Sequence, residues 1–410
     1  MIHVGVDIGK EHHCAVAIDD CAQRLMKPWV FSQTLEDYAE LERRMDALGP
    51  RDQIRIGIEQ TGHYGDNLIA YLLARGWNVE TYNPLVSAAM ARGNIRGTKS
   101  DPEDAFAGAC VVRDRRARPA REMEADLRAA KQMSRERCAL AEQLGSIKQR
   151  LGSLVDVVFP EFAQHFGDPY GVTALAVLEA YPSAQAVAKA HLRSLTSTIE
   201  NASRKQLGRS CALKLRASAQ TSVAQPSQVH GRDQCIGLIM TQIRFLKQHI
   251  KTLDQMIDQR LEHWQHHVRS VPGVGVRTGP TILAEFAAFA PFDSGRLNKK
   301  MLAFAGSDPK LRTSGKWKGK VKMTKRGSRT LRTALYQAAN IARQKSEPFK
   351  AVYERQIRKG KPFKVAISHV MRKLIDVIAA VLRDSQPYDP LRVGVDRSAK
   401  GVTGVVIVIQ

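Results

Sequence analysis

Four carboxylates in the N-terminal quarter of the chain have the types and positions of a metal-binding site. Asp7 and Glu59 each end a predicted strand, and Asp101 and Asp104 are three residues apart, on one face of a helix that Asp101 would open. Four carboxylates brought together can hold two Mg²⁺ ions, because hard divalent cations prefer oxygen ligands. Such a pair stabilises the attacking and the leaving oxygen of a phosphodiester exchange. Taken singly, each acid also has a structural interpretation, for example as an N-cap or a first-turn acid.

A basic run in the C-terminal third has the composition of a phosphate-binding surface. Residues 310–332 contain ten Lys and Arg and no acid. Ten uncompensated cations favour phosphate contact over a merely solvated surface. Alternation with other residues predicts that four lysines share one face of a strand: Lys316, Lys318, Lys320 and Lys322. Lys325 and Arg326 extend the predicted nucleic-acid-binding set.

Two smaller signals lie in the same third of the chain. Ser314 stands among cations, where a serine is either a phosphate-binding donor or a nucleophile, and both interpretations stay open. The turn at 272–275, which precedes a predicted helix, is similar to a helix-hairpin-helix turn. There, Gly273 and Gly275 would let backbone N–H groups approach a phosphate closely. An ordinary helix–helix turn fits the same residues.

Length and charge narrow the class of protein. A chain of 410 residues predicts two or three domains, and a net charge of +23 favours a polyanionic partner, either nucleic acid or an anionic membrane. Residues 1–66 are acidic, with twelve acids against seven Lys and Arg. An acidic N-terminal part followed by a basic remainder is more typical of a metal-dependent enzyme acting on phosphodiesters than of a ribosomal or purely structural basic protein.

The sequence predicts a cytoplasmic protein without a membrane partner. The longest apolar run, 402–409, is too short to span a bilayer, and the N-terminus lacks the basic start and apolar stretch of a signal peptide. The six cysteines form no CxxC pair, which fits a reducing compartment without a zinc site.

Hydrophobic periodicity predicts the elements that would position these residues. The N-terminal part is predicted to be an α/β domain with a mixed sheet, ending near 113–121. Its strands are expected at 2–7, 14–18, 53–59 and 78–82, and its helices at 35–48 and 63–75.

Two long helices with coiled-coil-type apolar seams are predicted at 140–158 and 236–257. Packing within one chain and a dimer interface fit these seams equally well. Between them, 160–232 is predicted to be a helical insert with a flexible end. Farther on, a loop or hairpin is expected at 306–328, and helices at 278–289, 329–344 and 362–383. The predicted domains are 1–120, 121–265 and 266–390, followed by a tail at 391–410.

In this order, the residues resemble the transposases of the insertion-sequence-110 family, relatives of the Piv-type DNA invertases. The resemblance covers both ends of the chain. At the N-terminal end it rests on residues 6–10, 58–64 and 99–105. At the C-terminal end it rests on residues 272–275, 304–306, 314–315, 325–327 and 331–336.

The resemblance implies a RuvC-like RNase H domain, a helical coiled-coil middle and a mostly helical C-terminal transposase domain. It implies that Asp7, Glu59, Asp101 and Asp104 are the catalytic acids and that Ser314 is the nucleophile. It further implies a composite site across the protomers of a dimer or tetramer, and a structured guide RNA that pairs with donor and target DNA. Gln60 and Ser307 depart from the family pattern at positions that are not catalytic, and the insert 160–232 is longer than in compact members.

Three other functions stay open at this point. A Piv-like site-specific invertase would use the same chemistry without a guide RNA. A Holliday-junction resolvase would hydrolyse DNA with the four acids and would not need Ser314. A domesticated binding protein would have an inactive site, but all four acids and the serine are present.

Overall fold

The chain divides into two units, Met1–Met123 and Glu124–Gln410, in the computed structural model. The four-part domain division expected from the sequence stays a prediction. The structure describes residues 1–60, 62–91, 100–121, 123–224, 231–262, 264, 267–310, 313–314, 317–318 and 322–390.

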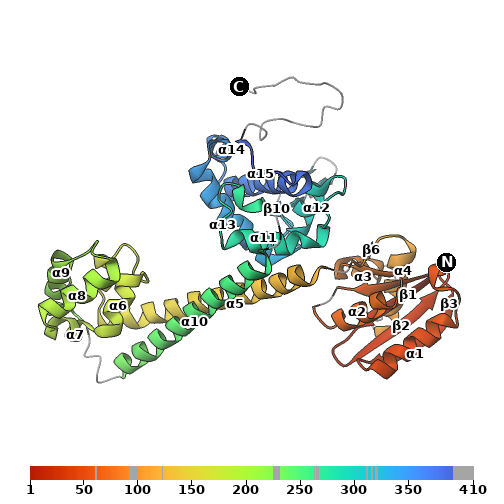
Figure 1. Ribbon diagram of the computed structural model, residues 1–410, viewed down its shortest axis with the longest axis horizontal. Helices are drawn as coiled ribbons and strands as arrows, with labels where there is room; N and C mark the ends of the chain where they lie inside the picture. The colour runs from red at the N-terminus through yellow and green to blue at the C-terminus, as the bar shows by residue number, and fades with distance from the viewer. Residues whose placement is uncertain are drawn as a thin grey trace. The chain divides into compact units, whose positions relative to one another are not determined.

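Alternating apolar residues in the first unit form one mixed sheet of six strands (Figure 1). Its order is β3-β2-β1-β4-β5-β6, with β1 antiparallel to β2 and parallel to β4. β2 and β3 are antiparallel, β4 and β5 parallel, and β5 and β6 antiparallel. This mixed topology fits the RNase H-like fold expected for the N-terminal part. The strands are β1 (Ile2–Ile8), β2 (His12–Ile18), β3 (Arg24–Ser32), β4 (Ile54–Glu59), β5 (Val79–Tyr82) and β6 (Arg118–Pro119).

Helices cover the two faces of this sheet with two separate cores. On one face, α1 (Leu35–Asp46) and α2 (Asp66–Ala74) bury Leu41 and Leu68 against alternate residues of β1 and β4, such as Val6. On the other face, α4 (Asp101–Arg113) packs on β1, β2 and β4, and Ala105 and Ala109 share a core with Cys14. α3 (Pro84–Ala91) packs beside α4.

The sequence analysis missed three elements of this unit. β3 is an edge strand with Pro28 in its interior and many exposed residues, so it lacks the alternation of a half-buried strand. α3 begins at Pro84, which ended the expected strand 78–82; proline is well tolerated in the first turn of a helix. β6 has only two residues.

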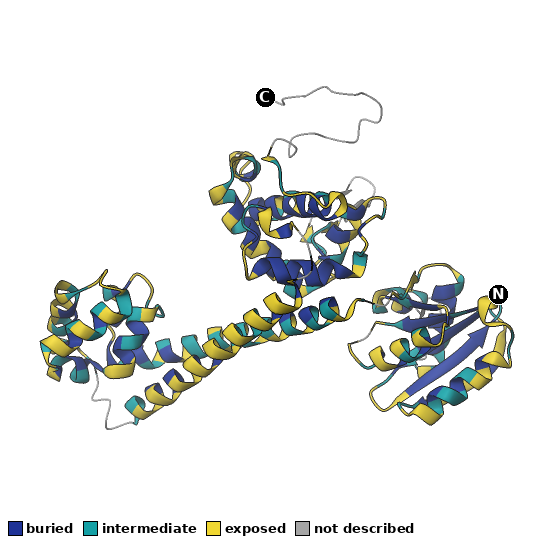
Figure 2. Ribbon diagram, in the orientation of Figure 1, coloured by how far each residue is buried: buried dark blue, intermediate teal, exposed yellow. Residues whose placement is uncertain are grey.

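Both predicted seams lie in one antiparallel pair of helices in the second unit, α5 (Ala125–Val158) and α10 (Arg232–Arg260) (Figures 1 and 2). Ile236, Ile239 and Ile243 are buried within the chain itself, whereas Ile250 is half-buried. The intramolecular interpretation of the seams is therefore confirmed for this pair, and an oligomer through the seams stays a prediction.

The predicted insert is a helical lobe built on the ends of these two helices. Phe159, Phe162 and Leu195 share one core with Val155 of α5 and Ile239 of α10. The flexible end expected for the insert falls on 225–230, outside the described residues. The lobe contains α6 (Val172–Ala180), α7 (Ala184–Lys189), α8 (Leu192–Ser203) and α9 (Arg209–Gln220).

The rest of the second unit packs around a long apolar helix, α15 (Phe363–Asp384). Its partners are α12 (Leu297–Phe304), α13 (Arg329–Lys345) and α14 (Glu347–Arg358), while α11 (Thr278–Phe286) packs on α13 and α5. Arg135 of α5 pairs with the fully buried Glu285 of α11, with Nε 2.8 Å from Oε1. α12 and α14 were not predicted: α12 has eight residues, and α14 carries Pro348 in its first turn. No helix of the described residues is long and apolar enough to cross a membrane.

Candidate active site

The two strand-end acids lie on neighbouring parallel strands. Val6 of β1 and Ile58 of β4 are partners in the parallel ladder. Asp7 follows the first of these residues and Glu59 follows the second. Asp7 and Glu59 are therefore at the same level of the sheet. Side chains alternate between faces along a strand, so Asp7 shares a face with Gly5, and Glu59 shares a face with Gly57.

Glycines on that face let α4 approach the sheet closely. A Cβ atom at Gly5 would lie 2.1 Å from the Ala105 carbonyl oxygen and 2.2 Å from the Ala109 nitrogen, both in α4. Gly108 of α4 lies against the Gly5 Cα and the Tyr82 hydroxyl. This contact sets the distance between the sheet and the first turn of α4, which carries Asp101 and Asp104.

The four acids form one electrostatic group. The pKa of Asp7 is raised to about 6. Burial is the largest cause, and the charges of Asp104, Asp101 and Glu59 add to it. Asp7, Glu59 and Asp104 are half-buried, and Asp101 is exposed. Among the described residues, a hydrogen bond with the Ile8 backbone lowers the pKa of Asp7 against these effects.

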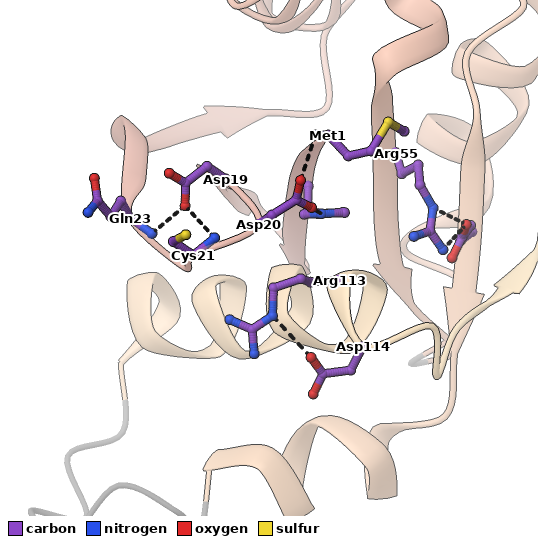
Figure 3. A network of polar contacts seen from close by, with 10 residues as sticks. Met1, Asp19, Asp20, Cys21, Gln23, Arg55, Arg113 and Asp114 are labelled. Atoms are coloured by element: carbon purple, nitrogen blue, oxygen red, sulfur yellow. Dashed lines mark hydrogen bonds and ion pairs between the residues drawn. The ribbon is translucent and has the colours of Figure 1, made fainter.

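Several acids elsewhere in the described part of this unit are paired with cations. Figure 3 shows the N-terminal amine, with Asp20 2.9 Å away, and the guanidinium of Arg55, which pairs with Glu80 at 2.6 Å. Hydrogen bonds from the N-terminal amine and from His3 lower the pKa of Asp20 to about 2. Glu103, between Asp101 and Asp104 in α4, pairs with Arg24 at 2.7 Å.

Two residues that the sequence analysis missed support the acids. The Ser87 hydroxyl, delivered by α3, donates a hydrogen bond to Glu59. Tyr82 is buried beside the group, and burial together with Glu59, Asp7 and Asp104 raises its pKa. The sequence contains a signal for the close approach of α4, although not for Ser87. A glycine stands two residues before each strand-end acid, in Gly5–Asp7 and Gly57–Glu59.

The donor set fits a hard divalent cation, since all four side chains offer carboxylate oxygens. In the described part of the chain, no three His, Cys, Asp or Glu side chains are arranged closely enough to hold a metal ion by themselves. Like charges gathered at a half-buried site, with one pKa raised, are the arrangement that a bound dication would stabilise.

Ser314 lies near the tip of a β-hairpin. β8 (Thr313–Ser314) pairs with β9 (Trp317–Lys318), and Ser314 is opposite Trp317. β7 (Pro309–Lys310) pairs with β10 (Lys322–Met323) nearer the base. Lys318 and Lys322 belong to different ladders, so the described residues do not form the single strand expected to carry all four lysines. Lys316 and Lys320 lie outside the described residues.

A glycine contact closes the base of this hairpin. Gly306 and Gly327 both have positive φ, and a Cβ atom on either would collide with the backbone of the other segment. The Lys325 nitrogen donates to the Gly306 carbonyl at 2.9 Å, and Arg332 donates to the Ala305 carbonyl at 3.2 Å. The base is thus fixed by the segments 304–306 and 325–327. Lys322, Lys325 and Arg326 are exposed there, as a phosphate-binding role requires.

The glycine turn at 272–275 has a structural role that the sequence analysis did not foresee. Gly273 has φ +84°, and a Cβ atom there would lie 2.1 Å from the Ala338 carbonyl oxygen of α13. Its missing side chain thus serves helix packing, and a role of the turn in phosphate approach stays a prediction. The Gly275 nitrogen donates to Thr278 Oγ1 at 3.1 Å, while Gly275 itself is exposed.

Replacing Gly5 by Ala is expected to separate α4 from β1 and to disperse the acids. The added methyl group meets helix backbone, which cannot rotate away, so we expect a loss of about 3 kcal/mol or more of unfolding free energy. In whatever fraction folds, the pKa of Asp7 should fall toward its ordinary value. Gly145→Ala in α5 is the control, because a Cβ atom there meets nothing within 4 Å. Equal melting temperatures for the Gly5 variant and the wild type would show that this contact does not set the spacing.

The raised pKa of Asp7 predicts how stability depends on pH and metal. Because the folded-state pKa of about 6 exceeds the ordinary 3.8, Asp7 favours the folded state below about pH 4 and loses that contribution as the pH rises through 6. Without metal at pH 7.5, Asp7→Asn should therefore be more stable than the wild type by about 1–2 kcal/mol, allowing for solvent screening. Added Mg²⁺ should raise the melting temperature of the wild type more than that of the variant. Equal responses to Mg²⁺ would contradict a metal site at Asp7.

Two models of transposase families match the chain. A transposase model of the DEDD, IS110 type matches residues 4–160, and a model described as "Transposase IS116/IS110/IS902 family" matches residues 265–354. The chain is 26% identical over 398 residues to the uncharacterized 44.8 kDa protein of insertion element IS116 from Streptomyces clavuligerus, covering 95% of this chain and 96% of that protein.

Two further comparisons are more limited. The chain is 30% identical over 160 residues to the pilin gene-inverting protein of Moraxella bovis, covering 36% of this chain and 47% of that protein. Among solved structures, RuvC of T. thermophilus in complex with a Holliday junction substrate aligns at a TM-score of 0.23 and 16% identity. That alignment covers 29% of this chain and 99% of the RuvC chain. Such a score is too low to establish a shared fold.

Proposed function

Because the chain belongs to the IS110 family of transposases, we propose that it cuts and rejoins DNA during transposition, with metal-binding acids and a serine nucleophile. The observation that carries the proposal is the group of four carboxylates at the sheet edge, where burial and, after it, the neighbouring carboxylates raise the pKa of Asp7 to about 6. Carboxylates gathered at a half-buried site are suited to divalent metal and phosphodiester chemistry and are costly otherwise.

In this proposal, Asp7, Glu59, Asp101 and Asp104 hold Mg²⁺. A bound Mg²⁺ offsets the charge of the scissile phosphate and lowers the pKa of the attacking hydroxyl. At neutral pH, about nine-tenths of Asp7 is ionised at a pKa near 6, as a metal ligand must be. Ser87 holds Glu59 by its hydrogen bond, and the glycine contacts hold α4 in place.

Ser314 supplies the nucleophile in the same proposal. Its oxygen forms a bond to the scissile phosphorus, the bond from phosphorus to the leaving sugar oxygen breaks, and the serine proton passes to a base as the leaving oxygen gains one. The resulting phosphoserine ester conserves the phosphodiester energy, so a DNA hydroxyl can later displace Ser314 without ATP. The exposed Lys322, Lys325 and Arg326 offset the charge of the phosphates.

We propose DNA as donor and target, a structured RNA from the element's non-coding end as guide, and a dimer or tetramer as the active form. The basic composition of 310–332 supports contact with nucleic acid. A Piv-like invertase without a guide is the second candidate, favoured by the 160-residue similarity to the pilin gene-inverting protein.

Joining assays with purified components separate these functions. We expect the protein, supplied with RNA transcribed from the non-coding flank of its gene, to join the element's end to target DNA, and to join none without that RNA. Products should be read by sequencing across the junctions. Equal joining without RNA would favour the invertase, and cleavage without any joining would favour a hydrolytic resolvase.

A further inference from the structure

A second group of cations lies on the last two helices, outside the basic run 310–332. Residues 355–373 contain seven Lys and Arg and no acid. The side chains of Arg355, Lys359, Lys361 and Arg372 are all exposed, and none forms an ion pair with an acid in the described part of the chain. The sequence analysis did not single out this group.

These four cations converge on His369. Arg355 comes from α14, Lys359 and Lys361 from the connection that follows, and Arg372 from α15. Burial lowers the pKa of His369, and the charges of all four cations lower it further, while no carboxylate raises it. α14 packs against α15, and the Lys361 nitrogen donates to the Gln356 carbonyl of α14 at 3.1 Å, so these successive parts of the chain bring the four cations to one surface.

Two exposed cations of the same helices are instead paired with acids. Lys350 in α14 lies 3.6 Å from Glu347, and Arg383 at the end of α15 lies 2.8 Å from Asp384. Unpaired like charges repel one another and reduce stability. The arrangement therefore has a cost in the free protein that a bound polyanion would remove.

An exposed aromatic ring lies beside the cations. Phe363, between Lys361 and Lys364 in sequence, is 41% exposed and packs edge-on against Tyr353, with ring centroids 6.0 Å apart. The Arg343 guanidinium lies over both rings. Aromatic rings among cations are suited to contacting sugars and bases as well as phosphates, which favours a nucleic-acid strand over a free anion.

We propose that Arg355, Lys359, Lys361 and Arg372, here called the α14–α15 surface, bind the phosphate backbone of a nucleic acid separately from the Ser314 hairpin. The inference deepens the proposed function and rests on it, because it assigns a second contact to the nucleic acid that the protein acts on. Either DNA or RNA has the required phosphates.

The test compares two variants with the same change in net charge. One is Arg355→Gln/Lys359→Gln/Lys361→Gln/Arg372→Gln. The control removes four exposed cations that have ion-pair partners: Arg43→Gln/Arg244→Gln/Lys350→Gln/Arg383→Gln. Both full-length variants should be checked for an unchanged fold, and then titrated with duplex DNA and with the flanking RNA over a range of salt concentrations.

For the α14–α15 variant, the slope of log affinity against log salt concentration should be shallower by about 3. Its affinity should be lower by on the order of 100-fold near 0.1 M salt. The control should match the wild type. A loss with only one of the two nucleic acids identifies which of them occupies the surface. In the wild type, the NMR-measured pKa of His369 should rise when the same nucleic acid binds, because phosphates offset the surrounding cations.

Equal losses in both variants would show an effect of net charge alone and would overturn the inference. An unchanged α14–α15 variant would also overturn it, while wild-type binding would leave the proposed function standing. A wild type that binds neither nucleic acid would overturn both.

Discussion

Asp7→Asn and Asp104→Asn are expected to lower the rate of DNA strand cleavage by about 1000-fold or more while nucleic-acid binding survives. Each substitution removes one charged oxygen donor from the group that would hold the metal, and preorganised charge is the largest contribution to catalysis in sites of this kind. The nucleic-acid contacts proposed above lie in residues 310–332 and 355–373, so affinity should not fall with activity. Single-turnover cleavage with Mg²⁺ measures the first quantity, and a binding titration the second.

Glu103→Gln is the matched control, because Glu103 lies in the same turn of α4 but pairs with Arg24. It should cleave at nearly the wild-type rate. Normal cleavage in either Asp variant, or an equal loss in the Glu103 variant, would contradict the assignment of the acids.

Ser314→Ala is expected to lose recombination completely while the protein still assembles on nucleic acid. A serine hydroxyl has far too high a pKa to attack a phosphate unaided. In a recombinase, the serine carries the phosphate as a covalent ester until the strands are rejoined. Ser314 pairs with Trp317 in a β-ladder, and the glycine contact fixes the hairpin base, which suits this role. Recombination should be followed as the yield of joined product.

Thr313→Ala tests whether any hydroxyl of β8 suffices. Thr313 is adjacent in the strand and pairs with Lys318, so its loss should leave joining nearly intact. If the Ser314 variant joined DNA normally, the nucleophile would be elsewhere.

Periodicity predicted the elements whose burial is one-sided and regular. In these elements the apolar residues recur at the spacing of a strand or a helix. They are β1, β4, α1, α5 and α10. The missed elements break that rule for physical reasons. β3 is an exposed edge strand with an internal proline, and α12 has only eight residues.

The residue types of the candidate site could be predicted from the sequence, but their arrangement in space could not. Strand-end acids can be recognised in a sequence, but Ser87 reaches Glu59 only through the placement of α3, which the sequence did not predict. The packing of Gly273 could not be predicted for the same reason, because its neighbour is Ala338, 65 positions later in the chain. Contacts between distant segments leave no local periodic signal.

The covalent intermediate tests the central claim most directly. Wild-type protein should be reacted with DNA and Mg²⁺, stopped with denaturant, digested with protease and nuclease, and mapped by mass spectrometry. The account predicts a denaturant-resistant protein–DNA adduct whose only modified peptide carries a nucleotide on Ser314, and no adduct in Ser314→Ala or Asp7→Asn. Efficient cleavage without an adduct, or an adduct on another residue, would contradict it.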